Sequence, residues 1–238
     1  MKDRRNWNIK KSIYEVIKRI FDILLSLLGI IITLPIMIII AIAIRIDSEG
    51  PIIFKQERTG KYGKNFNVWK FRTMVASNNV RDFSKKDEHT KVGNFLRKTS
   101  LDELPQLFNI FLGKMSFIGP RPWITDYYAN MNKRQKHRVD VTPGLTGLAQ
   151  VNGRNNITII KKINYDLEYI DNYGLYQDIK IVFLTIKIVL SKVGSDAGKS
   201  TIKNELEDLK LQNKFKKPAN SCDNCEKIKK DKDKLSIA

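Results

Sequence analysis

The chain has 238 residues, enough for one domain or two small ones with a sizeable buried core. With 13 glycines and two cysteines, it is neither collagen-like nor a disulfide-stapled scaffold. It carries 43 Lys and Arg against 25 Asp and Glu, a formal net charge of +18. An acidic partner is therefore expected: nucleic acid, an anionic membrane surface or a phosphorylated substrate.

The apolar residues are concentrated in one segment, residues 23–44. This segment has no charged residue, and 18 of its 22 positions are Ala, Ile, Leu or Met. As a straight helix it would be about 33 Å long, close to the hydrocarbon thickness of a bilayer, so it is predicted to be a membrane segment. A buried core helix is disfavoured because such helices seldom stay apolar on every face. The segment is also too long for the apolar part of a signal peptide.

Pro35 lies near the middle of this segment, where it removes one helix donor and clashes with the carbonyl of Ile31. A kink or break is expected there, and each half would reach only about half of the bilayer. Residues 1–19 and residues 45–72 carry seven basic side chains each. A spanning helix would violate the positive-inside rule in either orientation, so a re-entrant hairpin is favoured over a Pro-kinked spanning helix.

The rest of the chain alternates short strand and helix patterns. Two strand-like stretches, 51–56 and 66–71, flank a turn rich in Gly and Lys and predict a β-hairpin. Residues 75–90 read as a polar loop. Helices are predicted from about residue 92, near residue 100, over 157–172 and over 179–193; the last is apolar on most faces and is either an interfacial helix or a packed core helix. The polar residues beyond 196 predict a partly helical or disordered tail.

Asp102 and Glu103 are adjacent carboxylates in the sequence Ser-Leu-Asp-Glu-Leu-Pro-Gln-Leu, at a predicted helix start. Free backbone N–H groups and the helix dipole favour the charged form of a carboxylate there. Ser-x-x-Glu is also a capping box, and for this motif alone that structural explanation is favoured. The basic residues on either side of the pair shift the balance towards a site; they are Arg97, Lys98, Lys114 and Arg121.

Four basic positions are candidates for binding phosphate. Arg121 lies between two prolines that limit backbone freedom and could fix its guanidinium for bidentate contact. Arg154 lies in a Gly-rich loop, residues 142–155, whose glycines would let the backbone approach a ligand. Lys70 and Arg72 belong to an alternating strand and could equally form its solvent face.

Two other motifs are weak. Residues 194–200 resemble a P-loop, but only three residues separate the glycines where four are required. Cys222 and Cys225 offer half a zinc site, with no second cysteine pair, and His89 and His137 are distant and isolated; two reduced cytosolic thiols are the simpler interpretation. The sequence gives no role for the tail.

Taken together, the motifs resemble the bacterial sugar transferases, specifically the small monotopic phosphoglycosyl transferases that start glycan assembly on polyprenyl phosphate. The resemblance runs from about residue 18 to 192. It rests on the segments Lys-Arg-Ile-Phe-Asp-Ile-Leu-Leu-Ser (18–26), Gly-Pro-Ile-Ile-Phe-Lys-Gln-Glu-Arg (50–58), Lys-Phe-Arg-Thr-Met (70–74), the block 97–106, Ile-Gly-Pro-Arg-Pro (118–122) and Thr-Gly-Leu-Ala-Gln-Val-Asn-Gly-Arg-Asn (146–155). The chain departs from the pattern at Leu34, where some relatives have Ser, and at Leu148, where many have Trp.

This resemblance implies a reaction in which a UDP-sugar gives its sugar-1-phosphate to polyprenyl (undecaprenyl) phosphate and releases UMP. Asp102 would be the nucleophile that forms a covalent phosphosugar intermediate. Glu103 would bind the family cofactor Mg²⁺ or act as a base, and Asp102 and Glu103 would be the metal ligands. The positions implied to bind phosphate are Lys70, Arg72, Arg97, Arg121 and Arg154.

The expected fold class is α+β: a monotopic membrane protein with a Pro-broken re-entrant hairpin, a small β-hairpin and a compact, mostly helical cytosolic domain with interfacial amphipathic helices. The expected divisions are a basic interfacial segment (1–19), the membrane hairpin (20–46), the catalytic domain (47–195) and a charged tail (196–238). The expected place is the cytoplasmic face of the bacterial inner membrane, at the first membrane step of exopolysaccharide, capsule, O-antigen or glycoprotein glycan assembly. Anionic lipid headgroups, downstream glycosyltransferases and a second copy of the chain are the expected partners.

Two alternatives stay open from the sequence. In the first, the lipid phosphate attacks directly and the Asp-Glu pair only binds metal. In the second, the protein is a non-enzymatic, basic membrane-anchored scaffold, whose basic residues would be dispersed and would not converge on the carboxylate pair. Nucleic acid is not expected as a partner because aromatic residues do not alternate with the basic ones in a stacking pattern. The sequence does not distinguish which UDP-sugar is used.

Overall fold

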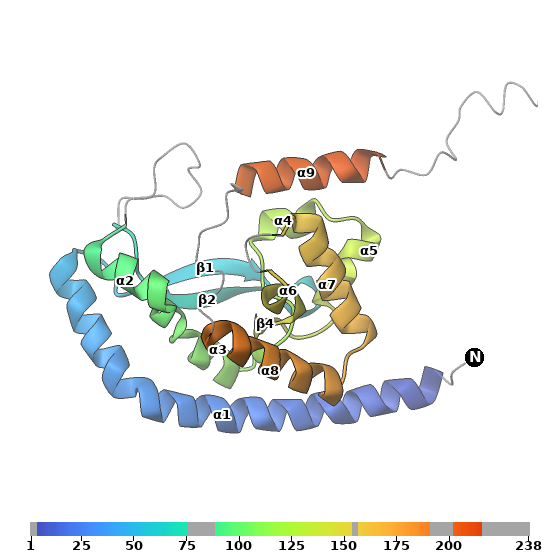
Figure 1. Cartoon of the computed structure of the whole chain (residues 1–238), viewed down its shortest axis with the longest axis horizontal. Helices are drawn as coiled ribbons and strands as arrows, with labels where there is room; N and C mark the ends of the chain where they lie inside the picture. Colours follow the sequence, from blue (N-terminus) through green and yellow to red (C-terminus); the bar gives the residue numbers. More distant parts are fainter. Residues whose placement is uncertain (1–3, 76–88, 154–156, 191–201, 216–238) are drawn as a thin grey trace, which may run out of the picture.

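The computed structural model describes residues 4–75, 89–153, 157–190 and 202–215. A long helix, α1, runs along one side, and a domain of short helices and two small sheets lies against its inner face (Figure 1). The elements of the first half are α1 (Arg4–Asp47), β1 (Ile53–Thr59), η1 (Lys61–Gly63), β2 (Asn65–Phe71), α2 (Lys91–Thr99), η2 (Leu101–Glu103) and α3 (Gln106–Phe111). Those of the second half are β3 (Ser116–Ile118), α4 (Thr125–Ala129), α5 (Lys133–Lys136), η3 (His137–Val139), β4 (Gly144–Thr146), α6 (Leu148–Val151), α7 (Ile159–Asp171), α8 (Leu175–Leu190) and α9 (Ile202–Phe215).

The membrane segment is part of α1, a helix of 44 residues that continues across Pro35. Figure 1 shows that α1 is bent and that its C-terminal part turns towards α2. Pro35 has no N–H to offer the preceding turn, and the hydroxyl of Thr33 donates to the carbonyl of Gly29 at 2.7 Å, two features that favour bending. The kink expected from the sequence therefore occurs without a break into two antiparallel helices.

One face of α1 packs against the domain along most of its length. Asp22 accepts hydrogen bonds from the hydroxyl of Ser116 and the N–H of Phe117, both at 3.1 Å. Met37 and Ile44 are buried in a cluster further along the helix. The opposite face is apolar and exposed, and six of its side chains that are more than half exposed are Leu24, Leu28, Ile31, Ile32, Ile39 and Ile46. By length and composition, Lys11–Asp47 is apolar enough to cross a bilayer.

The predicted β-hairpin is confirmed. β1 and β2 pair antiparallel, with Ile53 opposite Phe71 and Thr59 opposite Asn65. The hairpin is fixed at its open end by the core cluster of Phe71 and Leu96, which also takes in the C-terminal part of α1. The sheet therefore connects α1 to the region around α2 and η2.

A second, parallel pair of strands, β3 and β4, was not predicted from the sequence, because each has only three residues. The close approach of these strands depends on glycine: a Cβ atom on Gly144 would overlap the backbone of Gly119. The glycine at position 144 of the Gly-rich loop thus serves backbone packing against Gly119, whereas the sequence predicted an approach to a ligand.

Helix α8 confirms the helix expected over residues 179–193, as far as Leu190, and it has one packed face and one exposed face. Its inner face buries Ile181 and Asp178, whereas an apolar outer face is exposed. That outer face consists of Ile179, Val182, Phe183, Ile186 and Val189. Such an amphipathic helix is typical of one that lies in a membrane interface.

Replacing Phe183 by Asp is expected to weaken membrane association without unfolding the protein, because the ring is 69% exposed and forms no core contact. Transfer of a phenylalanine side chain from water to an apolar phase is worth roughly 2 kcal/mol. The fraction released from membranes by mild salt or carbonate washing should increase. The control is Leu211→Asp, the same kind of change at a 52% exposed position on α9, which lies on the opposite side of the domain from α1 (Figure 1). Equal release of the two variants would contradict the prediction.

Helix α9 belongs to the predicted tail, and it packs on the domain. Leu209 is fully buried in a cluster with Tyr127 and Ile163, and Asn213 donates to the carbonyl of Asn130 at 2.7 Å. The P-loop-like residues 194–200 and the pair Cys222 and Cys225 lie outside the described residues.

Replacing Leu209 by Ala is expected to lower the free energy of unfolding by about 2–4 kcal/mol, since it opens a cavity in this cluster. Leu211→Ala on the same helix is 52% exposed and should cost no more than about 0.5 kcal/mol. Thermal unfolding in detergent measures both. A Leu209→Ala protein as stable as the control would mean that α9 does not dock in solution.

Candidate active site

The adjacent carboxylates lie on η2, the 3₁₀ turn between α2 and α3. Ser100 precedes the turn in the left-handed conformation, with a φ of 58°, and its side chain makes no capping hydrogen bond. The capping-box explanation of this motif is therefore wrong. Asp102 is 8% exposed, and the carboxylate of Glu103 is turned towards cations that come from other elements.

Lys70 reaches both carboxylates from β2. Its Nζ lies 2.7 Å from Oε1 of Glu103 and 3.4 Å from Oδ2 of Asp102. Successive side chains of a strand point to opposite faces, so the burial of Phe71 in the core directs Lys70 to the other face, towards η2. The structure therefore brings Lys70 to the pair, 32 residues away in sequence.

Arg121 approaches the same glutamate from the Gly-Pro-Arg-Pro loop that follows β3. Its Nη2 lies 2.5 Å from Oε1 of Glu103, and its Nη1 donates to the carbonyl of Leu145 at 3.4 Å. The side chain of Arg121 is 40% exposed, against 23% for that of Lys70. Glu103 thus accepts from two cations, and Arg121 is the more exposed of the two.

The two carboxylates have opposite electrostatic character. Burial raises the pKa of Asp102 above its ordinary value, and the nearby charge of Lys70 offsets this only in part. Burial acts in the same direction on Glu103, but Arg121 and Lys70 together outweigh it and lower the pKa of Glu103 well below its usual range. Glu103 in turn raises the pKa of Arg121. Glu103 is therefore a firmly ionised partner of the cations, and Asp102 is a poorly solvated carboxylate beside it.

Arg58, at the end of β1, is a site residue that the sequence reasoning did not single out. Its pKa is lowered to about 10, first by burial and then by the positive charge of Arg121; Tyr127 and Glu103 act in the opposite direction. Its guanidinium donates to the side chain of Gln56. The signal was present in the motif of residues 50–58, which ends in this arginine, but nothing local shows that β1 ends beside the loop of Arg121.

Two of the predicted phosphate-binding residues, Arg72 and Arg97, lie away from the pair, and a third is not among the described residues. Arg72 is 5% exposed, and its guanidinium donates to the carbonyls of Ser48 and Glu49, so its contacts join β2 to the end of α1 and differ from the predicted role. Arg97 is exposed and contacts His89 at 2.6 Å. Arg154 lies outside the described residues.

The donor set of this site can be compared with the needs of a metal ion. Among the described residues, no group of three or more His, Cys, Asp and Glu side chains is gathered in one place. Mg²⁺ usually keeps several waters and binds through one or two carboxylates together with substrate phosphates. Asp102 and Glu103 fit that requirement only in the presence of a phosphorylated substrate.

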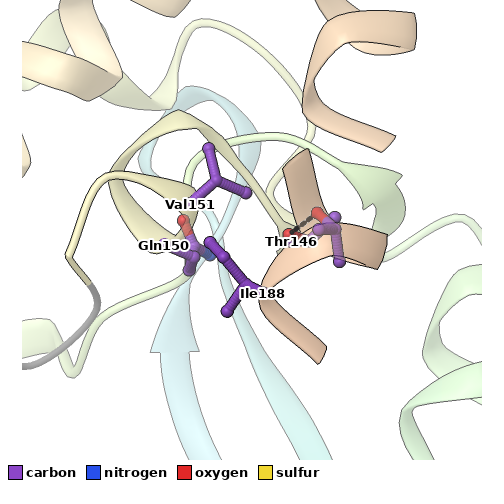
Figure 2. Close-up of a pocket in the computed structure, with 5 residues that line it drawn as sticks. Thr146, Gln150, Val151 and Ile188 are labelled. Carbon is purple, nitrogen blue, oxygen red and sulfur yellow. Dashed lines mark hydrogen bonds between the residues drawn. The ribbon is translucent and has the colours of Figure 1, made fainter. Parts of the chain in front are cut away.

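A small pocket lies between β4, α6 and α8 (Figure 2). Its walls include Thr146, whose hydroxyl pairs with that of Thr185 at 2.9 Å, and Gln150, whose amide has no hydrogen-bond partner among the described residues. With a cavity volume of roughly 20 Å³, it is far smaller than typical small-molecule sites. The candidate active site is therefore the open cluster around Glu103.

The chain belongs to the bacterial sugar transferase family, whose sequence model matches residues 13–192. The matched region contains η2, Lys70, Arg121 and the greater part of α1, and it ends before α9.

Three relatives illustrate the similarity. The chain is 45% identical over 187 residues to the UDP-glucose:undecaprenyl-phosphate glucose-1-phosphate transferase of Klebsiella pneumoniae, covering 74% of this chain and 40% of the relative. It is 40% identical over 181 residues to the uncharacterized sugar transferase EpsL of Bacillus subtilis strain 168, covering 75% of this chain and 90% of the relative. It is 38% identical over 207 residues to the undecaprenyl-phosphate galactose phosphotransferase of Salmonella typhimurium, covering 79% of this chain and 43% of the relative. The chain thus spans less than half the length of two of these three.

Proposed function

We propose that the protein is a phosphoglycosyl transferase that moves a sugar-1-phosphate from a UDP-sugar to undecaprenyl phosphate. The observation that carries this proposal is the convergence of Lys70 and Arg121 on the pair Asp102 and Glu103. A non-enzymatic scaffold would have no reason to gather cations from β2 and the loop after β3 around two carboxylates. The names of the relatives from Klebsiella and Salmonella support undecaprenyl phosphate as the acceptor.

In the proposed reaction, Asp102 attacks the phosphorus atom that is bonded to the sugar. The P–O bond to the uridylyl phosphate breaks, UMP leaves and an acyl phosphate forms on Asp102. An oxygen of undecaprenyl phosphate then attacks the same phosphorus, the bond to Asp102 breaks and its carboxylate is restored. A poorly hydrated carboxylate suits this role because less water must be removed before attack. No sugar C–O bond breaks, so the anomeric configuration is kept.

Arg121 and Lys70 are proposed to hold the diphosphate, with Arg58 as a third cation on the same side. Asp102 and Glu103 would hold Mg²⁺ together with phosphate oxygens, and the ion would supply charge neutralisation for the anionic substrates. Glu103 keeps both cations in place through its shared oxygen. These roles follow from charge and distance at the cluster.

The function is tested by adding a panel of UDP-sugars to the purified protein in membranes and measuring the release of UMP. Release that depends on one or two sugars and on undecaprenyl phosphate supports the proposal; no release with any sugar contradicts it. Incubation with labelled UDP-sugar alone should label Asp102. UMP release that strictly requires the lipid, with no labelled protein, would favour direct attack by the lipid phosphate, with the two carboxylates only binding metal.

We also propose that α1 enters the membrane from the cytoplasmic face and leaves by the same face. Both ends of its apolar part contact the same domain: Lys18 pairs with Asp178 of α8, and Ile44 is buried beside Leu96 of α2. A spanning helix would separate these ends by the full bilayer, about 30 Å of hydrocarbon. The exposed outer faces of α1 and α8 would then lie in the lipid, with basic residues near anionic headgroups.

Cysteine labelling tests this topology. In a protein with Cys222 and Cys225 replaced by Ser, single cysteines at Arg5 and at Tyr62, which is 66% exposed, should react with an impermeant reagent only from the cytoplasmic side. Labelling of the two positions from opposite sides would show that the helix spans the membrane. A bacterial inner-membrane location, downstream glycosyltransferases as consumers of the product and a homodimer remain parts of the same proposal.

A further inference from the structure

Arg138 is a buried arginine that the proposed reaction does not use. It lies on η3 and is 3% exposed. Its Nε and Nη2 donate to Oδ2 of Asp166 at 3.0 and 2.7 Å, and Nη2 also donates to the backbone carbonyl of Arg121 at 2.7 Å. Its guanidinium lies over the ring of Trp123, 3.8 Å from the ring centroid. All of these contacts of the Arg138 guanidinium are therefore with Asp166 or with the loop that carries Arg121.

The ion pair of Arg138 and Asp166 carries a large desolvation cost, so its contribution to stability alone does not explain it. Both side chains are about 2% exposed, and Oδ1 of Asp166 has no hydrogen-bond partner among the described residues. Buried ion pairs of this kind can often be replaced by apolar residues with no loss of stability, because desolvation offsets their attraction. Their best attested value is to hold one particular geometry.

The geometry that is held is the backbone of the loop that carries Arg121. The N–H of Gly119 donates to the carbonyl of Thr146 at 2.8 Å, and the carbonyl of Pro120 accepts from the N–H of Gly144 at 3.0 Å. Arg138 binds the next carbonyl of the loop, that of Arg121 itself. The following residue, Pro122, has no N–H and therefore adds no backbone donor to this part of the loop.

We propose that Arg138, oriented by Asp166, is a positioning residue for Arg121: it fixes the carbonyl of Arg121 so that the guanidinium meets both Glu103 and the diphosphate of the donor. This inference rests on the proposed function. A displacement of about 1 Å at a substrate-binding group can cost up to 100-fold in rate. Lysine cannot replace Arg138, because a single ammonium cannot lie flat on Trp123 while bridging a carboxylate and a carbonyl.

The test is a double-mutant cycle in UMP-release assays with a saturating lipid acceptor. Arg138→Lys alone is expected to lower kcat/KM for the UDP-sugar by about 10- to 100-fold, mainly through KM. In an Arg121→Ala background, the same change should cost less than about twofold, because Arg138 acts only through Arg121. An equal loss in both backgrounds, or no loss in either, would overturn the proposal.

The matched control is Arg19→Lys. Arg19 also donates to two backbone carbonyls, those of Ile110 and Phe111, both at 2.6 Å, but at the α1–α3 contact. Any loss of kcat/KM caused by Arg19→Lys should be the same fold-change with and without Arg121. Asp166→Asn, which keeps the shape of the carboxylate, repeats the cycle if Arg138→Lys does not fold. If Arg121→Ala alone leaves kcat/KM unchanged, the phosphate role of Arg121 in the proposed function fails. If Arg121→Ala lowers kcat/KM strongly but the loss caused by Arg138→Lys is the same with and without Arg121, only the positioning role of Arg138 is overturned.

Discussion

Replacing Asp102 by Asn is expected to abolish transfer, by at least about 10³-fold, while the protein stays as stable as the wild type or becomes more stable. Activity is lost because an amide cannot form the acyl phosphate. Stability is kept because burial raises the pKa of Asp102, so its ionised form is less favourable in the folded protein than in the unfolded chain. The free energy of unfolding of the wild type therefore falls as the pH rises from the ordinary aspartate pKa of 3.8 to the raised pKa of Asp102. The Asn variant has no buried charge at this position and does not lose that stability.

This prediction is checked by UMP release and by thermal unfolding at neutral pH. The control is Asp126→Asn on α4, where the aspartate is exposed, and neither activity nor melting temperature should change. Turnover in the Asp102→Asn protein would exclude the covalent mechanism. A marked loss of stability would mean that the carboxylate of Asp102 is a structural partner of Lys70.

Replacing Glu103 by Gln is expected to lower activity by about 100-fold and also to destabilise the protein, in contrast to the change at Asp102. Glu103 is the shared acceptor of Lys70 and Arg121. Without its charge these two cations repel each other, and Lys70 keeps only the longer contact with Asp102 among the ion pairs of the described residues. Removal of one partner of a fully buried pair costs about 3–5 kcal/mol. Here the side chains are 21–40% exposed, so roughly 1–2 kcal/mol is expected.

The pH dependence of this loss has a defined sign. The pKa of Glu103 is lowered in the folded protein from an ordinary value of 4.5, so its stabilising contribution is present above pH 4.5 and is lost as the pH falls below it. The difference in unfolding free energy between wild type and Glu103→Gln should therefore shrink between pH 7 and pH 4. Urea unfolding at both pH values measures it. A difference that stays constant or grows would show that the ion pairs of Glu103 do not form in solution.

Much of this protein can be predicted from local sequence patterns. The 22-residue apolar segment of α1, the alternation in β1 and β2 and the helical periodicity of α7 depend on neighbours within a few positions, so the long helix, the β-hairpin and α7 were predicted. The pair Asp102 and Glu103 can also be recognised from the sequence, because its two members are adjacent in the chain. The strands β3 and β4 are too short for any periodic signal.

The tertiary structure decides which basic residues meet the carboxylates. Arg72 follows Lys70 by two positions and looks equivalent in sequence, yet it joins β2 to α1, whereas Arg58 and Arg121 lie close together. That outcome depends on how β1, β2 and the loop after β3 pack, and no local pattern encodes it.

The same holds for the two carboxylates. Their residue types and spacing predict two anions, but burial and the positions of Lys70 and Arg121 raise the pKa of Asp102 and lower that of Glu103. The sequence by itself therefore determined the long apolar helix, the β-hairpin and the acidic pair. Only the tertiary structure assigned the cations and separated the electrostatic roles of the two acids, because desolvation and charge contacts depend on groups that are distant along the chain.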